Sequence, residues 1–558
     1  MKHGLRLIPF FTDLDETVLE AIERRCFRAR YRKGDTIFQE GDYGDRMYLV
    51  DSGQIKVVSE SNGQEKIYSY LGPGNFFGET ALLTGEPRNA TVRVVIDTEL
   101  IVLPKRDFED LLKQHPSLGL NLSRELGRRL TRTLHEPVQT EQFNLVSVVG
   151  PRAISLAQEL ARITGEEVLI FDMGGMKQVN VDLPELARQN VLLARASDTL
   201  GPDELALRLS TLVQEYYWII FSLPLTETPL TRKAAELADV TVQISNDTGD
   251  WRHPASKDFW RVRDNPVAIA RVARRICQRQ VGIALSSGNA RGFAHIGVLK
   301  VLQEEGIPID MIAATSIGAI FAALFAAGRS TEQILEFAMN VQRQYNFFTG
   351  FRYWDFGIPP RSGLIRGKAT HEYIRKWLED RSFADLEMPV HIVATDAISG
   401  EEVVFNTGPV ADAVRASISV IGVFEPARIG HRFLIDGGAV NPVPTSVLQD
   451  KGCNIIIASS VIPNLQDRLH RKQARAAGKP PNVFGIVMGA LEIMESEIIK
   501  TRMSGVHVLI KPDIARYTTL DYSKAQEIIK LGEEAARAEV ATIKQLLAPR
   551  PRKRDYDR

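Results

Sequence analysis

The rhythm of hydrophobic residues changes once along the chain, near Asn144, and this change constrains the fold more than any other feature. Before it, short apolar runs such as DTIFQEGD and RMYLVDSGQIKVVS alternate with closely spaced glycines, which is typical of a small β barrel or sandwich. After it, apolar runs such as NLVSVVG and EVLIFD alternate with amphipathic helices, which predicts parallel α/β structure. With 558 residues, the chain has room for about three or four domains.

Residues 140–278 hold the first set of alternating strands and helices. The turn after the first strand reads Gly150-Pro151-Arg152 and lacks the glycine-lysine motif that cradles phosphate. We therefore expect a Rossmann-like α/β domain without a P-loop, acting as a scaffold rather than as a nucleotide-binding domain. A second α/β region begins at Val281, runs to about residue 460 and leads into helical segments at 482–504 and 523–547.

A stripe of leucines links the barrel to the α/β regions. Four-residue spacing predicts a helix with one apolar side, which either packs on a core or forms a dimer seam. The sequence leaves both interpretations open, so a homodimer stays among the expectations. The stripe consists of Leu118, Leu122, Leu126, Leu130 and Leu134.

Charge and cysteine content exclude several classes of protein. The 69 basic and 69 acidic residues cancel, whereas a nucleic-acid-binding protein is expected to be basic. The three cysteines, Cys26, Cys277 and Cys453, are too few and too far apart for a disulfide framework or a cysteine metal site, which favours a reducing cytosol.

The amino terminus is a poor signal peptide. The uncharged stretch between Asp310 and Arg329 contains a Thr-Ser-Ile-Gly turn, so we expect a buried strand and helix there and no membrane span.

Residues 74–92 contain a pattern that is typical of a phosphate-binding turn, or phosphate cradle. The segment reads GNFFGETALLTGEPRNATV. A glycine and a carboxylate open a short helix, so the amides around Gly78, Thr80 and Ala81 are predicted to hold a phosphate. Arg88 follows nine residues after Glu79 and offers a forked, permanently charged donor. The alternative is a Glu–Arg ion pair on a turn.

Residues 10–135 resemble the cyclic-nucleotide-binding domains, in the cradle and in the preceding strands EGDYGDRMYLVDSGQIKVV. The resemblance implies that Glu79 meets the ribose and Arg88 the cyclic phosphate. Asn89 stands where some members carry a base-discriminating threonine or an alanine, so cAMP and cGMP both remain open as regulatory ligands.

The stretch IDMIAATSIGAIFAALF reads as a strand, a sharp turn and a helix, with Ser316 at the turn. A nucleophile elbow needs small residues two positions on either side of the serine, and Ala314 and Gly318 occupy these positions. The alternative is a buried serine that caps a core helix.

Two further segments favour the nucleophile. The loop Ser287-Gly288-Asn289-Ala290-Arg291-Gly292 follows an apolar strand. Its exposed amides, those of Gly288, Asn289, Ala290 and Arg291, are predicted to form an oxyanion hole. Asp436 ends a second strand and is followed by two glycines, which suits a base held near another loop. Asp396 is a second acidic candidate, disfavoured because no glycines follow it.

In order and spacing, these three segments resemble the patatin-like phospholipases over residues 281–545, most closely the bacterial neuropathy-target-esterase-like branch. The resemblance implies a patatin-like α/β hydrolase that cleaves phospholipid or lysophospholipid acyl esters without a cofactor or a metal. It also implies a Ser316–Asp436 dyad with no histidine, so His295 is expected to be structural, and Arg291 to fix the loop or to meet phosphate. Glycines are usual in the family where this chain has Ser287, Asn289 and Ala314, which keeps a non-catalytic sensor or scaffold as the alternative.

Together these features predict a multidomain α+β and α/β protein. We expect a β-roll cyclic-nucleotide-binding domain with its carboxy-terminal helix at 1–135, the Rossmann-like domain at 140–278, the hydrolase at 281–548 and a basic disordered tail at 549–558. Basic residues at 468–479 predict either peripheral contact with anionic headgroups or a solvated loop. The basic tail has the same two interpretations. The expected location is the cytoplasm, with contact at the inner membrane face.

Overall fold

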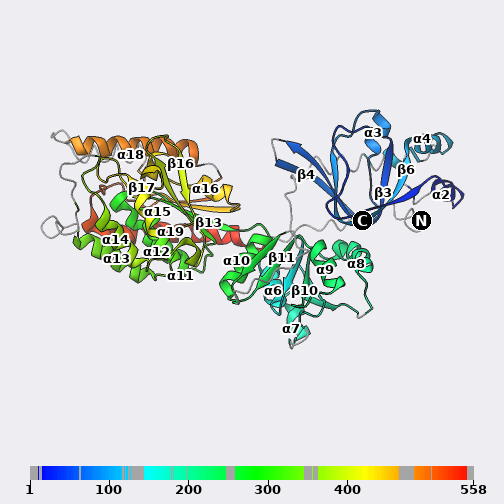
Figure 1. Cartoon of the computed structure of the whole chain (residues 1–558), viewed down its shortest axis with the longest axis horizontal. Coiled ribbons are helices and arrows are strands. Elements are labelled where there is room, and N and C mark those ends of the chain that lie inside the picture. The colour runs from blue at the N-terminus through cyan, green and yellow to red at the C-terminus, as the bar shows by residue number, and fades with distance from the viewer. Residues whose placement is uncertain are drawn as a thin grey trace. The chain divides into compact units, whose positions relative to one another are not determined.

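The computed structural model divides into two compact units, Met1–Cys277 with Pro549–Arg558, and Gln278–Ala548 (Figure 1). The basic cluster at 468–479, the tail beyond residue 549, Leu130 and Leu134 lie outside the residues that the structure describes. The described residues are 11, 16–61, 64–115, 118–119, 121–123, 126, 144–176, 179, 181–197, 199–246, 258–344, 355, 362–463, 483–503 and 505–549.

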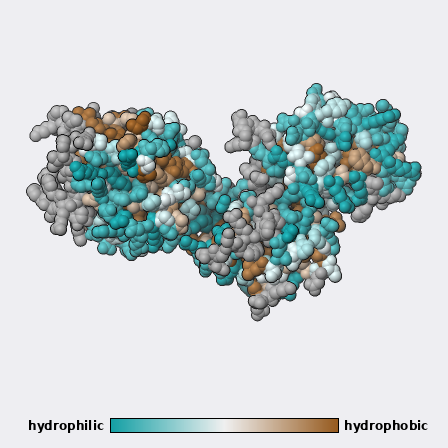
Figure 2. All heavy atoms as spheres, in the orientation of Figure 1, coloured by the Kyte–Doolittle hydropathy of each residue, from teal (hydrophilic) through white to brown (hydrophobic). Residues whose placement is uncertain are grey.

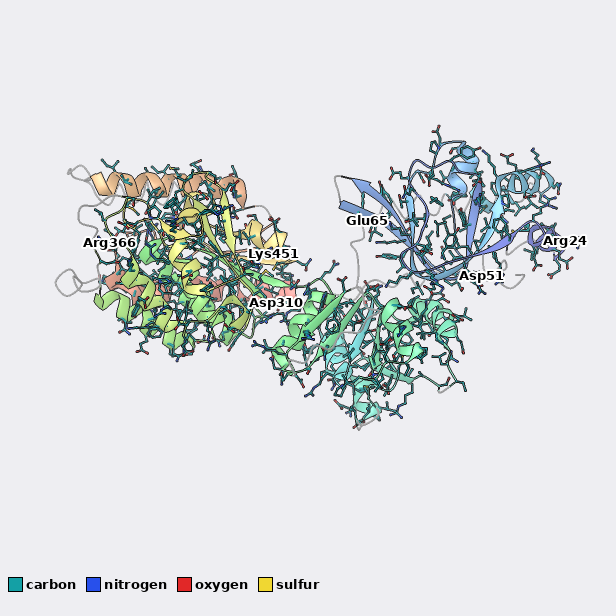
Figure 3. All side chains as sticks on the ribbon, viewed as in Figure 1. Arg24, Asp51, Glu65, Asp310, Arg366 and Lys451 are labelled. Carbon is teal, nitrogen blue, oxygen red and sulfur yellow. The ribbon has the colours of Figure 1, made fainter. Side chains whose placement is uncertain are left out.

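An antiparallel sheet with strand order β1-β6-β3-β4 forms the first part of the first unit, and β2 and β5 pair at its side. This arrangement confirms the barrel predicted from the glycine spacing. Glu65 of β4 forms ion pairs with Lys56 of β3 and Arg93 of β6 across the sheet (Figure 3). Leu118 and Leu122 are buried in the barrel's core, so the start of the leucine stripe packs inward. The elements are α2 (Glu16–Glu23), β1 (Phe27–Tyr31), β2 (Thr36–Phe38), β3 (Arg46–Ser61), β4 (Gln64–Leu71), β5 (Phe76–Phe77), α3 (Glu79–Thr84), β6 (Thr91–Pro104) and α4 (Lys105–Gln114).

A parallel sheet with the order β12-β11-β7-β10-β8-β9 forms the second part of this unit. Its central strands are buried on both faces, which explains their continuous apolar runs. One core lies under α6 and α10, and another lies under α8 and α9. β10 separates β7 from β8, whereas the usual dinucleotide-binding order places the first two strands side by side. The elements are β7 (Leu145–Val149), α6 (Ala153–Thr164), β8 (Val168–Asp172), α7 (Leu183–Arg188), β9 (Val191–Arg195), α8 (Pro202–Glu215), β10 (Trp218–Leu223), α9 (Pro229–Leu237), β11 (Val240–Ile244), β12 (Phe259–Val262) and α10 (Pro266–Ile276).

The barrel and this parallel sheet share buried contacts. Ile96 of β6 belongs to the core under α8 and α9. The Lys33 ammonium donates to the Leu237 and Ala238 carbonyls at 2.9 and 3.1 Å and pairs with Asp239 at 2.8 Å, which satisfies the carboxyl end of α9. These contacts join the two parts into one unit.

The second unit is built on a mixed sheet with the order β17-β18-β15-β14-β13-β19-β20, and β16 pairs with β15. The strands from β15 to β20 along this order run parallel, while β18 and β16 run antiparallel to β15. Asp310 fixes the start of β14 against β13, because its carboxylate accepts the Val281 N–H at 2.9 Å (Figure 3). The strands are β13 (Val281–Leu285), β14 (Met311–Thr315), β15 (Val390–Asp396), β16 (Glu402–Phe405), β17 (Ala427–Ile429), β18 (Arg432–Asp436), β19 (Ile455–Ser459) and β20 (Val508–Ile510).

Helices cover both faces of this sheet. The larger core packs α11, α12, α13, α14, α15 and α19 on one face, and a smaller core packs α16 and the end of α18 on the other. Residues 310–329 form β14 and α12, as predicted, and among the described residues no helix is long and apolar enough to cross a bilayer. The helices are α11 (Ala294–Glu304), α12 (Ile317–Ala326), α13 (Thr331–Gln344), α14 (Lys368–Trp377), α15 (Val410–Ser417), α16 (Thr445–Asp450), α18 (Val483–Arg502) and α19 (Ala525–Leu547).

Phe321 of α12 is fully buried in the larger core, so its truncation tests the packing of the second unit. We expect Phe321→Ala to lower the free energy of unfolding by about 3–5 kcal/mol, because it leaves a cavity. Phe433→Ala, at a half-exposed position of the same unit, should change it by less than about 0.5 kcal/mol. Urea denaturation measures both, and equal losses in the two variants would contradict the assigned core.

Candidate active site

Ser316 occupies a strained turn between β14 and α12. Its φ of 57° and ψ of −125° lie outside the common regions for L-residues, at a cost of about 1–3 kcal/mol. The Ser316 N–H donates to the Ser417 hydroxyl at 2.8 Å, and that hydroxyl donates to the Val393 carbonyl at 2.6 Å. A side chain at Gly318 would place its Cβ 2.7 Å from the Leu285 carbonyl oxygen, so only glycine fits there.

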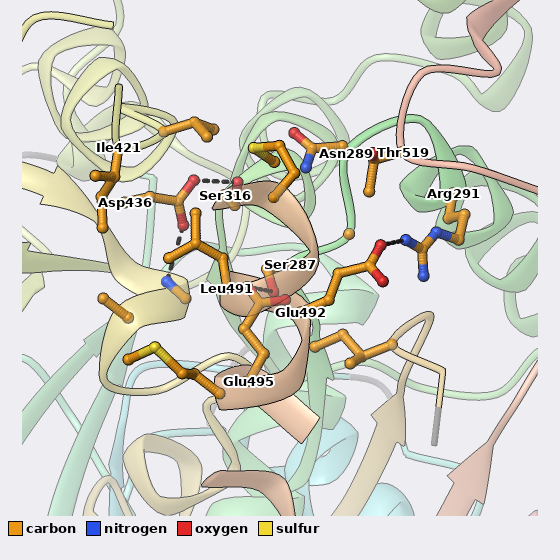
Figure 4. Close-up of a pocket in the computed structure, with 17 residues that line it drawn as sticks. Ser287, Asn289, Arg291, Ser316, Ile421, Asp436, Leu491, Glu492, Glu495 and Thr519 are labelled. Atoms are coloured by element: carbon orange, nitrogen blue, oxygen red, sulfur yellow. Dashed lines mark hydrogen bonds and ion pairs between the residues drawn. The ribbon is translucent and has the colours of Figure 1, made fainter. Parts of the chain in front are cut away.

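The side chains of Ser316 and Asp436 meet at the carboxyl ends of β14 and β18 (Figure 4). The Ser316 hydroxyl donates to Asp436 Oδ2 at 2.5 Å, and the Gly438 N–H donates to Asp436 Oδ1 at 2.8 Å. Burial raises the pKa of the Asp436 carboxyl to about 6, although both hydrogen bonds oppose this shift. The carboxylate is therefore a stronger base than an exposed aspartate and is aimed at the serine hydroxyl.

A pocket contains this pair. Ser287, Gly288, Asn289 and Arg291 line it from the loop after β13. Its apolar lining comes from residues on several elements: Val420, Ile421, Ala439, Ile462, Met488, Leu491 and Met494.

Of the four predicted oxyanion amides in the loop after β13, two already donate a hydrogen bond to a carbonyl and two do not. The Ala290 N–H donates to the Thr519 carbonyl at 3.3 Å, and the Arg291 N–H donates to the Gly288 carbonyl at 3.2 Å. Among the described residues, the N–H groups of Gly288 and Asn289 make no such hydrogen bond. Gly288 and Asn289 both have positive φ, at 154° and 50°.

Two carboxyl side chains of α18 also reach this loop, and neither is predicted from the sequence. Glu492 pairs with the guanidinium of Arg291, whose side chain is only 1% exposed, and the Ser287 hydroxyl donates to Glu495 at 2.7 Å (Figure 4). Burial, reinforced by the charges of Asp436 and Glu492, raises the pKa of Glu495 to about 8. The only available signal was their three-residue spacing, which places them on one side of a helix.

His295 and Asp396 both lie outside the pocket lining. The His295 ring bonds the Ser459 hydroxyl at 2.8 Å and the Ser286 carbonyl at 3.0 Å, and burial lowers its pKa to about 4. The Asp396 carboxylate accepts the Ile398 and Ser399 N–H groups in the turn after β15, and these bonds lower its pKa. Both residues stabilise local backbone.

The barrel brings the predicted cradle residues together at α3. Gly78 precedes this helix in the left-handed conformation, with a φ of 80°. The Arg88 guanidinium is buried and donates to the Gly78 and Arg46 carbonyls at 2.6 and 2.7 Å. Glu79 is buried and acts electrostatically on Arg88, so the two do lie in one site. Ala81 is buried, whereas Thr80 and Asn89 are exposed.

Two aromatic residues that the sequence pattern does not single out hold Arg88 in place. Its guanidinium lies over the Phe38 ring, 4.2 Å from the centroid, and 5.9 Å from that of Tyr48. Tyr48 stacks on Phe77 at 5.1 Å. Aromatic residues at alternate strand positions are ordinary core, so the pattern gave no sign of this role.

Comparison with known proteins assigns both sites to families. Residues 283–448 match the model of the patatin-like phospholipases, and residues 28–115 match that of the cyclic nucleotide-binding domain. The first match includes the loop after β13, Ser316 and Asp436, and the second includes Glu79 and Arg88.

The chain aligns with known proteins over long stretches. The chain is 24% identical to an uncharacterized NTE family protein of Mycobacterium tuberculosis (strain CDC 1551), over 96% of both chains. It is 23% identical to the lysophospholipase nte1 of Aspergillus fumigatus, over 89% of this chain and 41% of that protein. The chain thus carries a patatin-like phospholipase domain and a cyclic nucleotide-binding domain.

Proposed function

We propose that this chain hydrolyses acyl esters of phospholipids or lysophospholipids through a Ser316–Asp436 dyad. The observation that carries the proposal is the 2.5 Å hydrogen bond from a serine on a strained turn to a buried carboxylate. The apolar lining of the pocket suits an acyl chain, and the fungal relative is named a lysophospholipase.

The geometry supports a two-step mechanism. Asp436 accepts the hydroxyl proton as Ser316 attacks the ester carbonyl, and the Gly288 and Asn289 amides stabilise the oxyanion. The proton then passes from Asp436 to the departing alcohol, leaving an acyl-serine. Asp436 next takes a proton from water, whose oxygen attacks the acyl group. The fatty acid is released as the proton passes from Asp436 to the departing Ser316 oxygen. We assign the oxyanion to Gly288 and Asn289 because the Ala290 and Arg291 amides already donate elsewhere.

Replacing either member of the dyad tests the chemistry. We expect Ser316→Ala and Asp436→Asn each to lower the lysophospholipid hydrolysis rate at least about 10³-fold, because both act in one proton transfer. Asp396→Asn is the matched control and should keep the rate within about threefold. Labelling by a fluorophosphonate probe should disappear in Ser316→Ala alone among serine variants of the pocket. Persistent labelling there would overturn the nucleophile, and absent labelling of the wild type would favour a non-catalytic scaffold.

The raised pKa of Asp436 predicts the pH dependence. Only the ionised carboxylate accepts a proton, so the labelling rate of Ser316 should fall about tenfold for each pH unit below about 6. An ordinary aspartate would lose its charge near its usual value of 3.8, about two units lower. Asp396→Asn should keep the midpoint of the profile. A flat profile between pH 4 and 7 would rule out Asp436 as the base.

We further propose that the barrel binds a cyclic nucleotide and thereby regulates hydrolysis. Arg88 is a buried, forked cation, and we expect it to exchange its carbonyl partners for the cyclic phosphate while Glu79 accepts from the ribose. None of Cys26, Cys277 and Cys453 forms a disulfide, which suits a reducing cytoplasm.

Calorimetry with cAMP and cGMP tests the ligand. Arg88→Ala should weaken binding at least about tenfold, and Arg88→Lys should restore part of it through its charge alone. The control is Arg30→Ala, since Arg30 is exposed and paired with Glu99 on the same barrel. Equal heats in wild type and Arg88→Ala would refute the cradle. Unchanged hydrolysis on saturation with the ligand would refute regulation.

A further inference from the structure

Helix α18 presents a row of exposed apolar side chains next to the candidate active site. Ile486, Val487, Ile493 and Met494 are 56%, 41%, 53% and 53% exposed. Seven residues, two helical turns, separate the members of each pair, so all four lie on one side of the helix. Figure 2 shows hydrophobic atoms gathered over the position of α18. Isolated exposed apolar residues are common, but a continuous row on one element marks an interaction surface.

The opposite side of α18 contacts the candidate active site through an ion pair and a hydrogen bond. Glu492 and Glu495 hold Arg291 and Ser287 of the loop after β13. Ile499 and Met503 pack on the smaller core of the sheet. Because these contacts fix the rotation of the helix, the apolar row faces outward.

We propose that the outer side of α18 docks on the acyl-chain region of a lipid surface and feeds lipid into the Ser316 pocket. This inference rests on the proposed function, since a lipid substrate resides in such a surface. The apolar row is continuous with the pocket, because Met494 is half-exposed and also lines it. An acyl chain leaving the lipid phase would therefore stay in contact with apolar side chains.

The distribution of charged residues along α18 favours a lipid phase as the partner that binds its outer side. Residues 483–491, VFGIVMGAL, carry no charge, and the charged residues Glu492, Glu495, Glu497, Lys500 and Arg502 all follow them. Nine residues span about 14 Å, enough to lie within a bilayer interface but too short to cross it. The sign of the headgroup charge is thus immaterial to this surface.

Vesicle binding by a Ser316→Ala background tests the proposal without hydrolysis. We expect this protein to cosediment with neutral phosphatidylcholine vesicles in 0.5 M salt, and Ile486→Asp with Ile493→Asp to lower the bound fraction at least tenfold. Ile398→Asp is the matched control, since Ile398 is 82% exposed elsewhere in the same unit. It should bind like the background.

Fluorescence and activity give independent readouts. Ile486→Trp should show a blue shift on vesicle addition, and Ile398→Trp should show none. In the Ser316 enzyme, the double aspartate variant should keep its rate on a dispersed short-chain ester within twofold while losing at least tenfold on vesicles.

Three results would overturn the proposal: unchanged vesicle binding in the double variant, binding that requires anionic lipid and vanishes in salt, or loss of a dimer in sedimentation with vesicle binding intact. Vesicle binding without any hydrolysis by the Ser316 enzyme would instead refute the proposed function and leave the docking surface standing.

Discussion

The backbone at Ser316 is the constraint on which the second unit depends. A residue with a φ of 57° between a strand and a helix brings α12 so close to β13 that no side chain fits at position 318. The strain persists because Ser417 and Val393 anchor the Ser316 amide.

Burial then sets the charges around the serine. Three carboxyl groups, those of Asp436, Glu492 and Glu495, belong to one pocket, but only Glu492 faces a buried cation. Burial raises the pKa of the other two, to about 8 for Glu495 and to about 6 for Asp436, so Glu495 holds its proton to a higher pH than Asp436 does. This separation of acidities arises from position within the fold rather than from residue type.

Much of this architecture could be predicted from the sequence, because hydrophobic rhythm and local turn chemistry are local signals. The barrel, the buried strand and helix at 310–329 and the segments containing Ser316 and Asp436 all have such signals. The order of strands in a sheet has no local signal in the sequence. The position of β10 between β7 and β8 could therefore not be predicted. Glu492 and Glu495 were missed because they approach Arg291 and Ser287 only through tertiary packing across about 200 residues. The contact of Phe38 with the Arg88 guanidinium could not be predicted, because in sequence such an aromatic residue cannot be told apart from one in the hydrophobic core.

The contacts of Ile96 and Lys33 carry a consequence for any attempt to divide the protein. Ile96 belongs to the barrel by sequence, yet it fills the core beneath α8 and α9. A fragment that starts at β7 would expose that core to water and leave the carboxyl end of α9 without the Lys33 ammonium. The natural place to separate the protein is therefore after Cys277, which keeps the barrel and the parallel sheet together in one unit.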